Sequence, residues 1–244
     1  MKFKLTVIFL LVLIFGANAQ SVTYDNTSYG DDIRTVILQK AISIYDPLPL
    51  IALGSSEKLR LSFDILSPNN EFFNYTYIHC DRNWQESSLQ QMEYISGKLM
   101  GDIVDFKFST NTYQRFTHYA LNFPEKDMEI TKSGNYILKI YRNFDLEDVV
   151  LTRRFMVLDR HTSISTNIRS ATDPEYRFTH QEVDFSVNYE GFTIPNPFLD
   201  VNVTVLQNNS WNNAIYNLKP LFVNNNELSF NYEDKNLFPG TNEF

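Results

Sequence analysis

The sequence predicts an all-β protein built from tandem antiparallel β-sandwich domains of the immunoglobulin or fibronectin type. Apolar residues recur at every second position in many short stretches, which is typical of half-buried strands. These stretches follow one another at intervals of roughly eight to twelve residues, as they do in antiparallel sandwiches. The chain is also rich in aromatic residues and asparagine and poor in alanine, a composition that favours strands and turns.

In the first half of the chain, three stretches show this alternation clearly. Their alternating apolar residues are Leu59, Leu61, Phe63 and Ile65, then Tyr119, Leu121 and Phe123, and then Tyr136, Leu138 and Ile140. The stretch from Val149 to Leu158 is less regular, because Arg153 and Arg154 lie in its middle. We interpret it either as an edge strand or as a strand whose two faces differ. Only the interval from Ser87 to Ile95 looks helical.

The second half contains the best alternation of the whole sequence. The apolar residues are Val183, Phe185, Val187 and Tyr189, then Val201, Val203 and Val205 before an Asn-rich turn at 208–213, and finally Leu228, Phe230 and Tyr232. We place a domain boundary near Asp159. Residues 20–160 then form a complete first sandwich, whereas residues 161–244 supply only four or five strands. Because a seven-stranded sandwich takes about 100 residues, we expect the second domain to be incomplete.

The first nineteen residues have the pattern of a cleavable secretion signal. Lys2 and Lys4 precede an uncharged apolar run, and Ala17 to Ala19 form an A-x-A cleavage site, so we expect residues 1–19 to be removed. The apolar run is too short to span a bilayer. We therefore expect a soluble exported protein, and Gln20 in place of a cysteine argues against a direct lipid anchor.

Without this leader the chain has 19 basic and 29 acidic residues, a net charge of −10. Nucleic acid is an improbable partner for such a chain, because phosphate binding depends on clustered lysine and arginine. The single cysteine excludes an internal disulfide, so stability must come from apolar cores.

That cysteine stands in the stretch YTYIHCDRNW, directly after a histidine. Adjacent residues of a strand point to opposite faces, so His79 and Cys80 should not act together as a metal site or as nucleophile and base. We interpret Cys80 as a small buried residue beside Ile78, with a reactive thiol or an intermolecular link as the alternatives. Trp84, after the Asp81-Arg82-Asn83 corner, is interpreted as a plug closing the end of the sandwich, or else as an exposed ligand anchor.

Other polar groups give weaker signals. His180, Glu182 and Asp184 share one strand face and fit a metal cluster or an acid/base pair, but a polar outer face gives the same pattern. His118 and His161 have no partner that the sequence identifies. Because no catalytic, phosphate-binding or dinucleotide motif is present, we expect no catalytic, metal or cofactor-binding residues, although a glycosidase carboxylate pair stays open.

Loop aromatics offer a separate possibility. Phe192, Phe198 and Trp211 lie near Pro or Asn turns, where exposed rings could stack on sugars. The alternative is that these rings pack against their own sandwich, which is the commoner arrangement.

Five longer stretches resemble one family in the same order along the chain. They are YTYIHCDRNW, TKSGNYILKIY, VLTRRFMVLD, ATDPEYRFTHQEVDF and LFPGTNEF. From about Arg34 to its last residue, the chain is similar to the plug proteins of the type IX secretion system of Bacteroidota, whose members run on past this point. Residues 20–32 match no motif of that family, and we expect them to be a lead-in without fixed structure.

The resemblance implies a periplasmic β-sandwich protein associated with the outer membrane. It implies a non-enzymatic gating subunit that occludes the periplasmic opening of a very large outer-membrane β-barrel translocon. It implies no catalytic residues and no cofactors, and it leaves the partner-binding surface unknown. The alternative from a different class is a secreted glycan-binding module or an accessory protein of polysaccharide processing.

Overall fold

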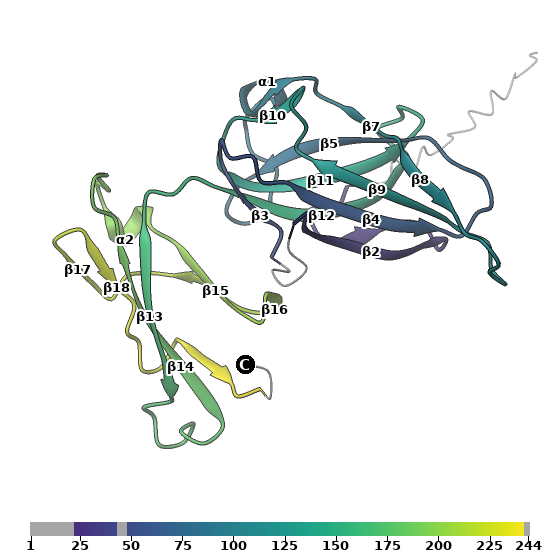
Figure 1. Ribbon diagram of the computed structural model, residues 1–244. Helices are drawn as coiled ribbons and strands as arrows, with labels where there is room; N and C mark the ends of the chain where they lie inside the picture. Colours follow the sequence, from purple (N-terminus) through teal and green to yellow (C-terminus); the bar gives the residue numbers. More distant parts are fainter. Residues whose placement is uncertain (1–21, 43–47, 242–244) are drawn as a thin grey trace, which may run out of the picture.

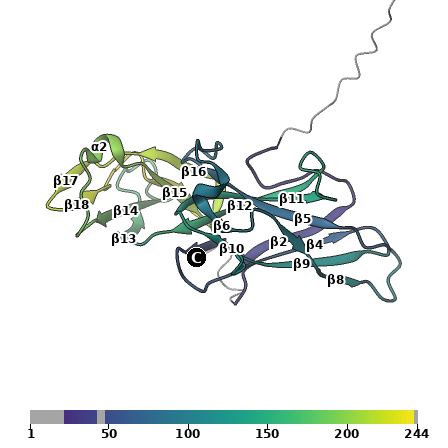
Figure 2. The same ribbon diagram turned by 90° about the horizontal axis from the view of Figure 1, so that it is seen from above.

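The computed structural model describes residues 22–42 and 48–241, and the predicted leader at 1–19 lies outside them. Nearly all regular structure in the described residues is β-strand, arranged as two groups of sheets joined at residues 159–162 (Figure 1). Viewed from above, the two groups lie side by side, with the first group to the right (Figure 2). The fold class predicted from the alternation is therefore confirmed.

The first group contains two sheets that face each other. One sheet has the strand order β1-β12-β11-β5-β7, and β3 pairs with β12 as well. Its strands are β1 (Thr27–Ser28), β12 (Val149–Leu158), β11 (Gly134–Arg142), β5 (Phe73–Cys80), β7 (Gly101–Ile103) and β3 (Leu50–Ala52). All neighbours are antiparallel except β3 and β12, which run parallel. The strand that looked irregular, β12, lies inside this sheet and has two different faces.

The second sheet of the first group has the order β2-β4-β9-β8 and is antiparallel throughout. Its strands are β2 (Ile33–Lys40), β4 (Leu59–Ile65), β9 (Thr117–Phe123) and β8 (Asp105–Phe108). Every second residue of β4 is buried, as its alternation predicts. The chain passes from the first sheet to the second at Val104, between β7 and β8.

Aromatic rings fill the space between these two sheets. Phe63 stacks on Tyr119 with ring centroids 5.2 Å apart, and Tyr136 stacks on Phe155 at the same distance. Both pairs are completely buried. Because each large ring buries about 150–250 Å² and prefers specific contact geometries, this core makes the first sandwich a stiff body.

The interval that looked helical holds one short helix, α1 (Gln91–Tyr94). It is followed by β6 (Ile95–Gly97), which pairs with β10 (Met128–Ile130) to form a two-stranded sheet beside the sandwich. A second short helix, α2 (Pro197–Asp200), was not predicted.

The second group has one larger and one smaller sheet. The larger has the order β13-β14-β18-β17, with β19 also on β14, and β15 pairs with β16 in the smaller. The strands are β13 (Ser163–Ser170), β14 (His180–Asn188), β15 (Val203–Gln207), β16 (Ser210–Leu218), β17 (Phe222–Asn224), β18 (Glu227–Ser229) and β19 (Leu237–Pro239). The expected count of four or five strands is thus wrong. The strand expected through Phe230 and Tyr232 ends at Ser229, and β16 begins inside the predicted Asn-rich turn.

Strand β13 is the least covered part of the second group. All eight of its residues are exposed, although it pairs with β14 along its whole length. Ile164 and Ile168 lie opposite Val187 and Val183, on the side of the sheet that carries the second core. They remain 63% and 61% exposed, so the apolar face of this sheet is only partly covered in the described residues.

Candidate functional site: a tryptophan–arginine junction

The stretch 75–84 places His79 and Cys80 in separate surroundings. His79 packs edge-to-face on Tyr136, and its Nδ1 lies 2.8 Å from the Ser87 hydroxyl oxygen. Cys80 instead belongs to a cluster with Trp84 and Ile137 on the other face of β5. The two residues point away from each other, as the strand pattern predicts, and they form no joint site.

Cys80 is 2% exposed, in agreement with its interpretation as a small buried residue. Burial, and secondarily the negative charges of Glu86 and Asp81, raise the pKa of this thiol to about 12. Since the thiolate is the reactive form, the folded protein keeps Cys80 unreactive at neutral pH.

Trp84 is held at the corner that follows β5. The Asp81 carboxylate accepts hydrogen bonds from the backbone amides of Asn83 (2.8 Å) and Gln85 (3.0 Å), and the Trp84 amide donates to the Asp81 carbonyl. Trp84 has a φ of +61°, a left-handed conformation that is strained for a bulky residue. This turn directs the indole back over the outer face of the first sheet.

The indole of Trp84 is buried, as its interpretation as a plug requires, and is not an exposed ligand anchor; it packs in a cluster with Cys80 and Ile137 that is separate from the core between the two sheets. It is 4% exposed because Arg154 and Trp211 cover it. The Arg154 guanidinium lies 4.5 Å from the centre of the Trp84 ring and 5.7 Å from that of Trp211. The two indoles meet edge-to-face, with centroids 5.2 Å apart and ring planes at 87°. We call Trp84, Arg154 and Trp211 the junction.

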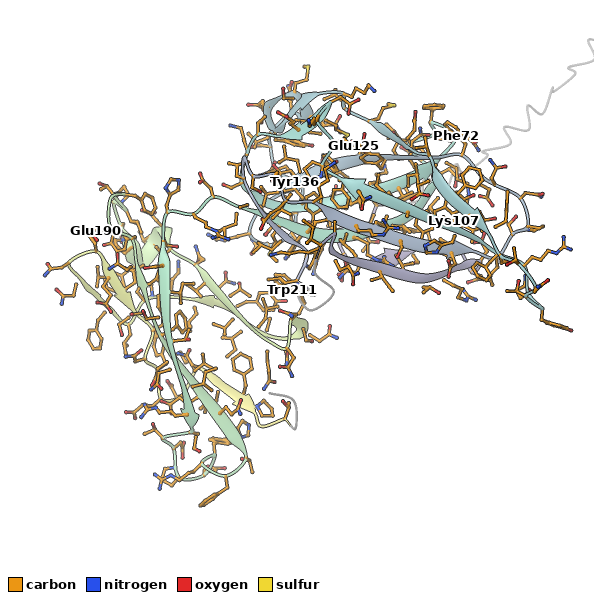
Figure 3. All side chains as sticks on the ribbon, in the orientation of Figure 1. Phe72, Lys107, Glu125, Tyr136, Glu190 and Trp211 are labelled. Carbon is orange, nitrogen blue, oxygen red and sulfur yellow. The ribbon has the colours of Figure 1, made fainter. Side chains whose placement is uncertain are left out.

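The junction connects the two groups of strands. Trp84 and Arg154 belong to the first group, whereas Trp211 lies on β16, in the hairpin whose turn is formed by Asn208 and Asn209. Figure 3 shows Trp211 at the side of the second group that faces the first sandwich. Cation–π and aromatic pair contacts of this kind contribute about 0.5–1.5 kcal/mol each. The junction therefore supplies a specific contact between the two groups besides the covalent link.

The N-terminal segment is part of the same structure. Arg154 donates from Nε and Nη2 to the carbonyl oxygen of Tyr24, and its Nη1 lies 3.4 Å from the Asp25 carboxylate. The Asn26 side chain accepts a hydrogen bond from the Arg154 amide, and Tyr24 donates its hydroxyl to Glu86. The expectation of a lead-in without fixed structure is wrong for residues 22–32, because these polar contacts hold the segment on β12.

The acidic face of β14 is also different from the expected solvated surface. Glu182 is fully buried and Asp184 nearly so, and Arg169 on β13 lies 2.7 Å and 2.9 Å from their carboxylates. The Thr172 amide donates to Glu182 at 2.6 Å. Although burial opposes it, these hydrogen bonds and the charge of Arg169 lower the pKa of Glu182. Burial raises the pKa of Asp184, partly offset by Arg169 and reinforced by the charge of Glu182.

His180 does not join these carboxylates. Its ring packs on Tyr176, and its Nδ1 lies 2.8 Å from the Thr179 hydroxyl. Within residues 22–42 and 48–241, no group of three or more His, Cys, Asp and Glu side chains is placed to hold a metal ion. The same residues contain no helix long and apolar enough to cross a membrane.

The two remaining histidines have carboxylate partners that the sequence did not identify. His118 lies 2.7 Å from Asp64 on the neighbouring strand β4, and His161 lies 2.9 Å from Asp159. The His161–Asp159 pair is largely exposed, whereas the His118–Asp64 pair is partly buried.

Of the three loop aromatics considered for sugar stacking, Phe192 and Phe198 are about half exposed, at 45% and 49%. Trp211 is occupied by the junction and by Tyr216, whose ring stacks on it in the same hairpin. Trp211 is thus not a free ring for sugar stacking, and it packs against the first sandwich as well as against its own hairpin.

Sequence reasoning missed the partners of Trp84. The sequence signal for these partners was the pair Arg153 and Arg154 in the middle of β12, because a charged side chain within a strand of a packed sheet requires polar or aromatic partners. The contact with Trp211 joins residues far apart in the sequence, and alternation within one strand carries no information about it.

Comparison with known proteins gives a family match. The family model described as type 9 secretion system plug protein, first domain, matches residues 33–159. Among solved structures, a hypothetical protein from Parabacteroides merdae ATCC 43184 matches with a TM-score of 0.86 and 29% sequence identity. The match covers 92% of this chain and 56% of that protein, so the chain spans about half the length of this relative. No curated protein matches the chain.

Proposed function

The chain belongs to the type 9 secretion system plug protein family, and from this premise we propose that it is a non-enzymatic plug. In this proposal it occludes the periplasmic opening of the large outer-membrane β-barrel translocon of that system. It acts by binding one state of the barrel and leaving it when the barrel changes to a cargo-bearing state. The observation that carries the proposal is the family match over residues 33–159, which hold the first sandwich from β2 to β12.

The junction gives this proposal a physical basis. A plug has to keep its shape against a wide opening, so its parts must not swing freely on a linker. Here the first sandwich has an aromatic core, and Trp84, Arg154 and Trp211 tie the second group of strands to it. Two sandwiches joined in this way can present a surface of the size that a specific protein interface needs, about 1,200–2,000 Å² in total.

We further propose the organisation in which the plug works. Residues 1–19 are a signal peptide, residues 20–160 the first domain and residues 161–244 part of a second sandwich domain that is incomplete. The exposed apolar residues of β13 support the last point, because a complete sandwich would cover that face. The protein is periplasmic and associates with the outer membrane through the translocon.

Deletion of the gene tests the proposed function. The expected result is an outer membrane that admits large antibiotics normally kept out, and re-expression of the protein restores the barrier. Unchanged permeability, in cells shown to make the translocon, would overturn the proposal. A glycan array with the purified protein, run in parallel, tests the sugar-binding alternative. The engagement of Trp211 in the junction does not favour that alternative.

A further inference from the structure

An exposed apolar patch lies at the end of the first sandwich that is remote from the junction. Its residues are Phe72, Phe144 and Leu146, which are 48%, 58% and 47% exposed, and we call them the aromatic tip. Phe72 directly precedes β5, whereas Trp84 follows the other end of the same strand. In Figure 3 the labels of Phe72 and Trp211 accordingly lie on opposite sides of the first sandwich. The second group of strands therefore leaves the tip uncovered.

The aromatic tip is held in place by buried polar groups. The Phe72 and Phe144 rings pack with centroids 5.6 Å apart, and the Asn143 amide donates to the Phe72 carbonyl. The Phe144 amide donates to the side-chain oxygen of Asn74 at 2.8 Å, and Asn74 in turn donates to Asp102. Asn74 is fully buried, so the loop position of Phe144 is fixed from inside the fold.

Phe144 adopts a backbone conformation that its own side chain disfavours. Its φ is +63° and that of Asn143 is +50°, both in the left-handed region. Asparagine tolerates this region, whereas a bulky aromatic residue there is an outlier that costs about 1–3 kcal/mol. Burial of the ring does not offset this cost, because more than half of the side chain faces solvent. Strained residues of this kind cluster at functional positions such as active sites, ligand clamps and switch regions.

Arg142 braces the loops that carry the tip. Its Nε donates to Glu71 at 2.7 Å, and its Nη1 donates to Asp148 at 3.3 Å. Its Nη2 lies 3.7 Å from Asp32, so one guanidinium connects three separate segments of the chain. Loops that are already ordered lose little entropy on association, which improves the affinity of any contact they make.

The surroundings of the aromatic tip are strongly acidic. The carboxylates of the three braced segments are Asp31, Asp32, Glu71, Asp145, Glu147 and Asp148, and their basic residues are Arg34 and Arg142. These six negative and two positive charges give the three segments together a formal net charge of −4. A complementary surface has an apolar pocket surrounded by lysine or arginine.

We propose that the aromatic tip is the surface that docks on the translocon, with Phe144 inserted into an apolar pocket that has a basic rim. The inference rests on the proposed function and names the face of the plug that carries it. Aromatic residues, phenylalanine included, are enriched in the cores of protein interfaces, which are surrounded by a polar rim. The acidic rim steers the encounter and makes association faster at low salt.

The test uses the full chain with an affinity tag, expressed in a host that makes the translocon, and recovers complexes from detergent-solubilised outer membranes. Phe144→Asn is the informative variant, because asparagine accepts the left-handed backbone while removing the ring. Phe178→Asn is the matched control, since Phe178 is 94% exposed but lies in the second group. Leu146→Ser provides a second tip variant outside the strained turn. Circular dichroism and thermal unfolding establish that each variant is folded.

The expected result is recovery of the translocon barrel, identified by mass spectrometry, with the wild type and Phe178→Asn. Phe144→Asn should bind at least about 30-fold more weakly, the loss typical of a hot-spot residue. Equal binding by all variants would overturn the role of the tip and leave the proposed function standing. If the folded wild type recovers no barrel, the proposed function and the tip proposal both fail.

Discussion

Replacement of Trp211 by alanine tests whether the junction fixes the two groups of strands to each other. The change removes the edge-to-face contact with Trp84, worth about 0.5–1.5 kcal/mol, and the contact with Arg154, worth about 0.5–1 kcal/mol. We therefore expect Trp211→Ala to lower the free energy of unfolding of the full chain by about 1–2.5 kcal/mol through the junction, in addition to the local loss of its stacking on Tyr216. Urea unfolding measures this loss, and small-angle X-ray scattering should show a wider range of distances between the groups.

Two controls separate the junction from the general effect of removing an aromatic ring. Phe222→Ala removes an exposed ring of the same group that makes no junction contact, and it should change stability by less than about 0.5 kcal/mol. A double-mutant cycle with Arg154→Gln isolates the contact between Arg154 and Trp211. If Trp211→Ala leaves both the unfolding energy and the scattering curve unchanged, the junction does not hold the groups together.

Four further outcomes follow from the packing and the shifted pKa values. Gly101→Ala places a Cβ in steric overlap with the ring of the buried Tyr75, so we expect the free energy of unfolding measured in urea to fall by about 1–3 kcal/mol; a neutral effect would contradict the packing. Because the pKa of Cys80 is raised to about 12, a fraction of only about 10⁻⁴ of this thiol is ionised at pH 8 in the folded protein. A thiol reagent should therefore react rapidly with Cys80 only after unfolding, and rapid reaction of the folded protein would refute the expectation. Folding lowers the pKa of Glu182 below its unfolded value near 4.5. Ionised Glu182 therefore contributes fully to the free energy of unfolding above pH 4.5, and this contribution is lost as the pH falls through the lower pKa of the folded state. Acid titration of stability should therefore become flatter with Glu182→Gln, and an unchanged slope would count against the ion pair. Residues 161–244 expressed alone should aggregate more readily than residues 20–159, because β13 is uncovered; equal solubility by light scattering would speak against an open edge.

Local alternation was sufficient to predict the strands with one buried face. In β4 every second residue is buried, and the two faces of β5 separate His79 from Cys80 as the pattern indicates. Such predictions succeed because side-chain direction in a strand has a period of two that the sequence displays directly.

The incorrect or incomplete predictions concern contacts between distant segments. Glu182 and Asp184 looked like a solvated face, but Arg169 on the neighbouring strand and the chain around Thr172 bury them. Trp84 was expected to be buried, but the expectation did not identify Trp211, which covers it from another group of strands. In both cases the deciding residue is supplied by tertiary packing, about which the local pattern carries no information.

The early segment Tyr24–Asn26 binds Arg154, which comes 128–130 positions later in the chain. A polypeptide that leaves the ribosome or an export channel with its amino end first therefore exposes this segment long before its binding partner emerges. The N-terminal segment cannot bind β12 until the chain has emerged to about residue 158, and contacts between residues so far apart in the sequence form slowly. The order in which the strands are made thereby delays closure of the first sandwich until β12 is available.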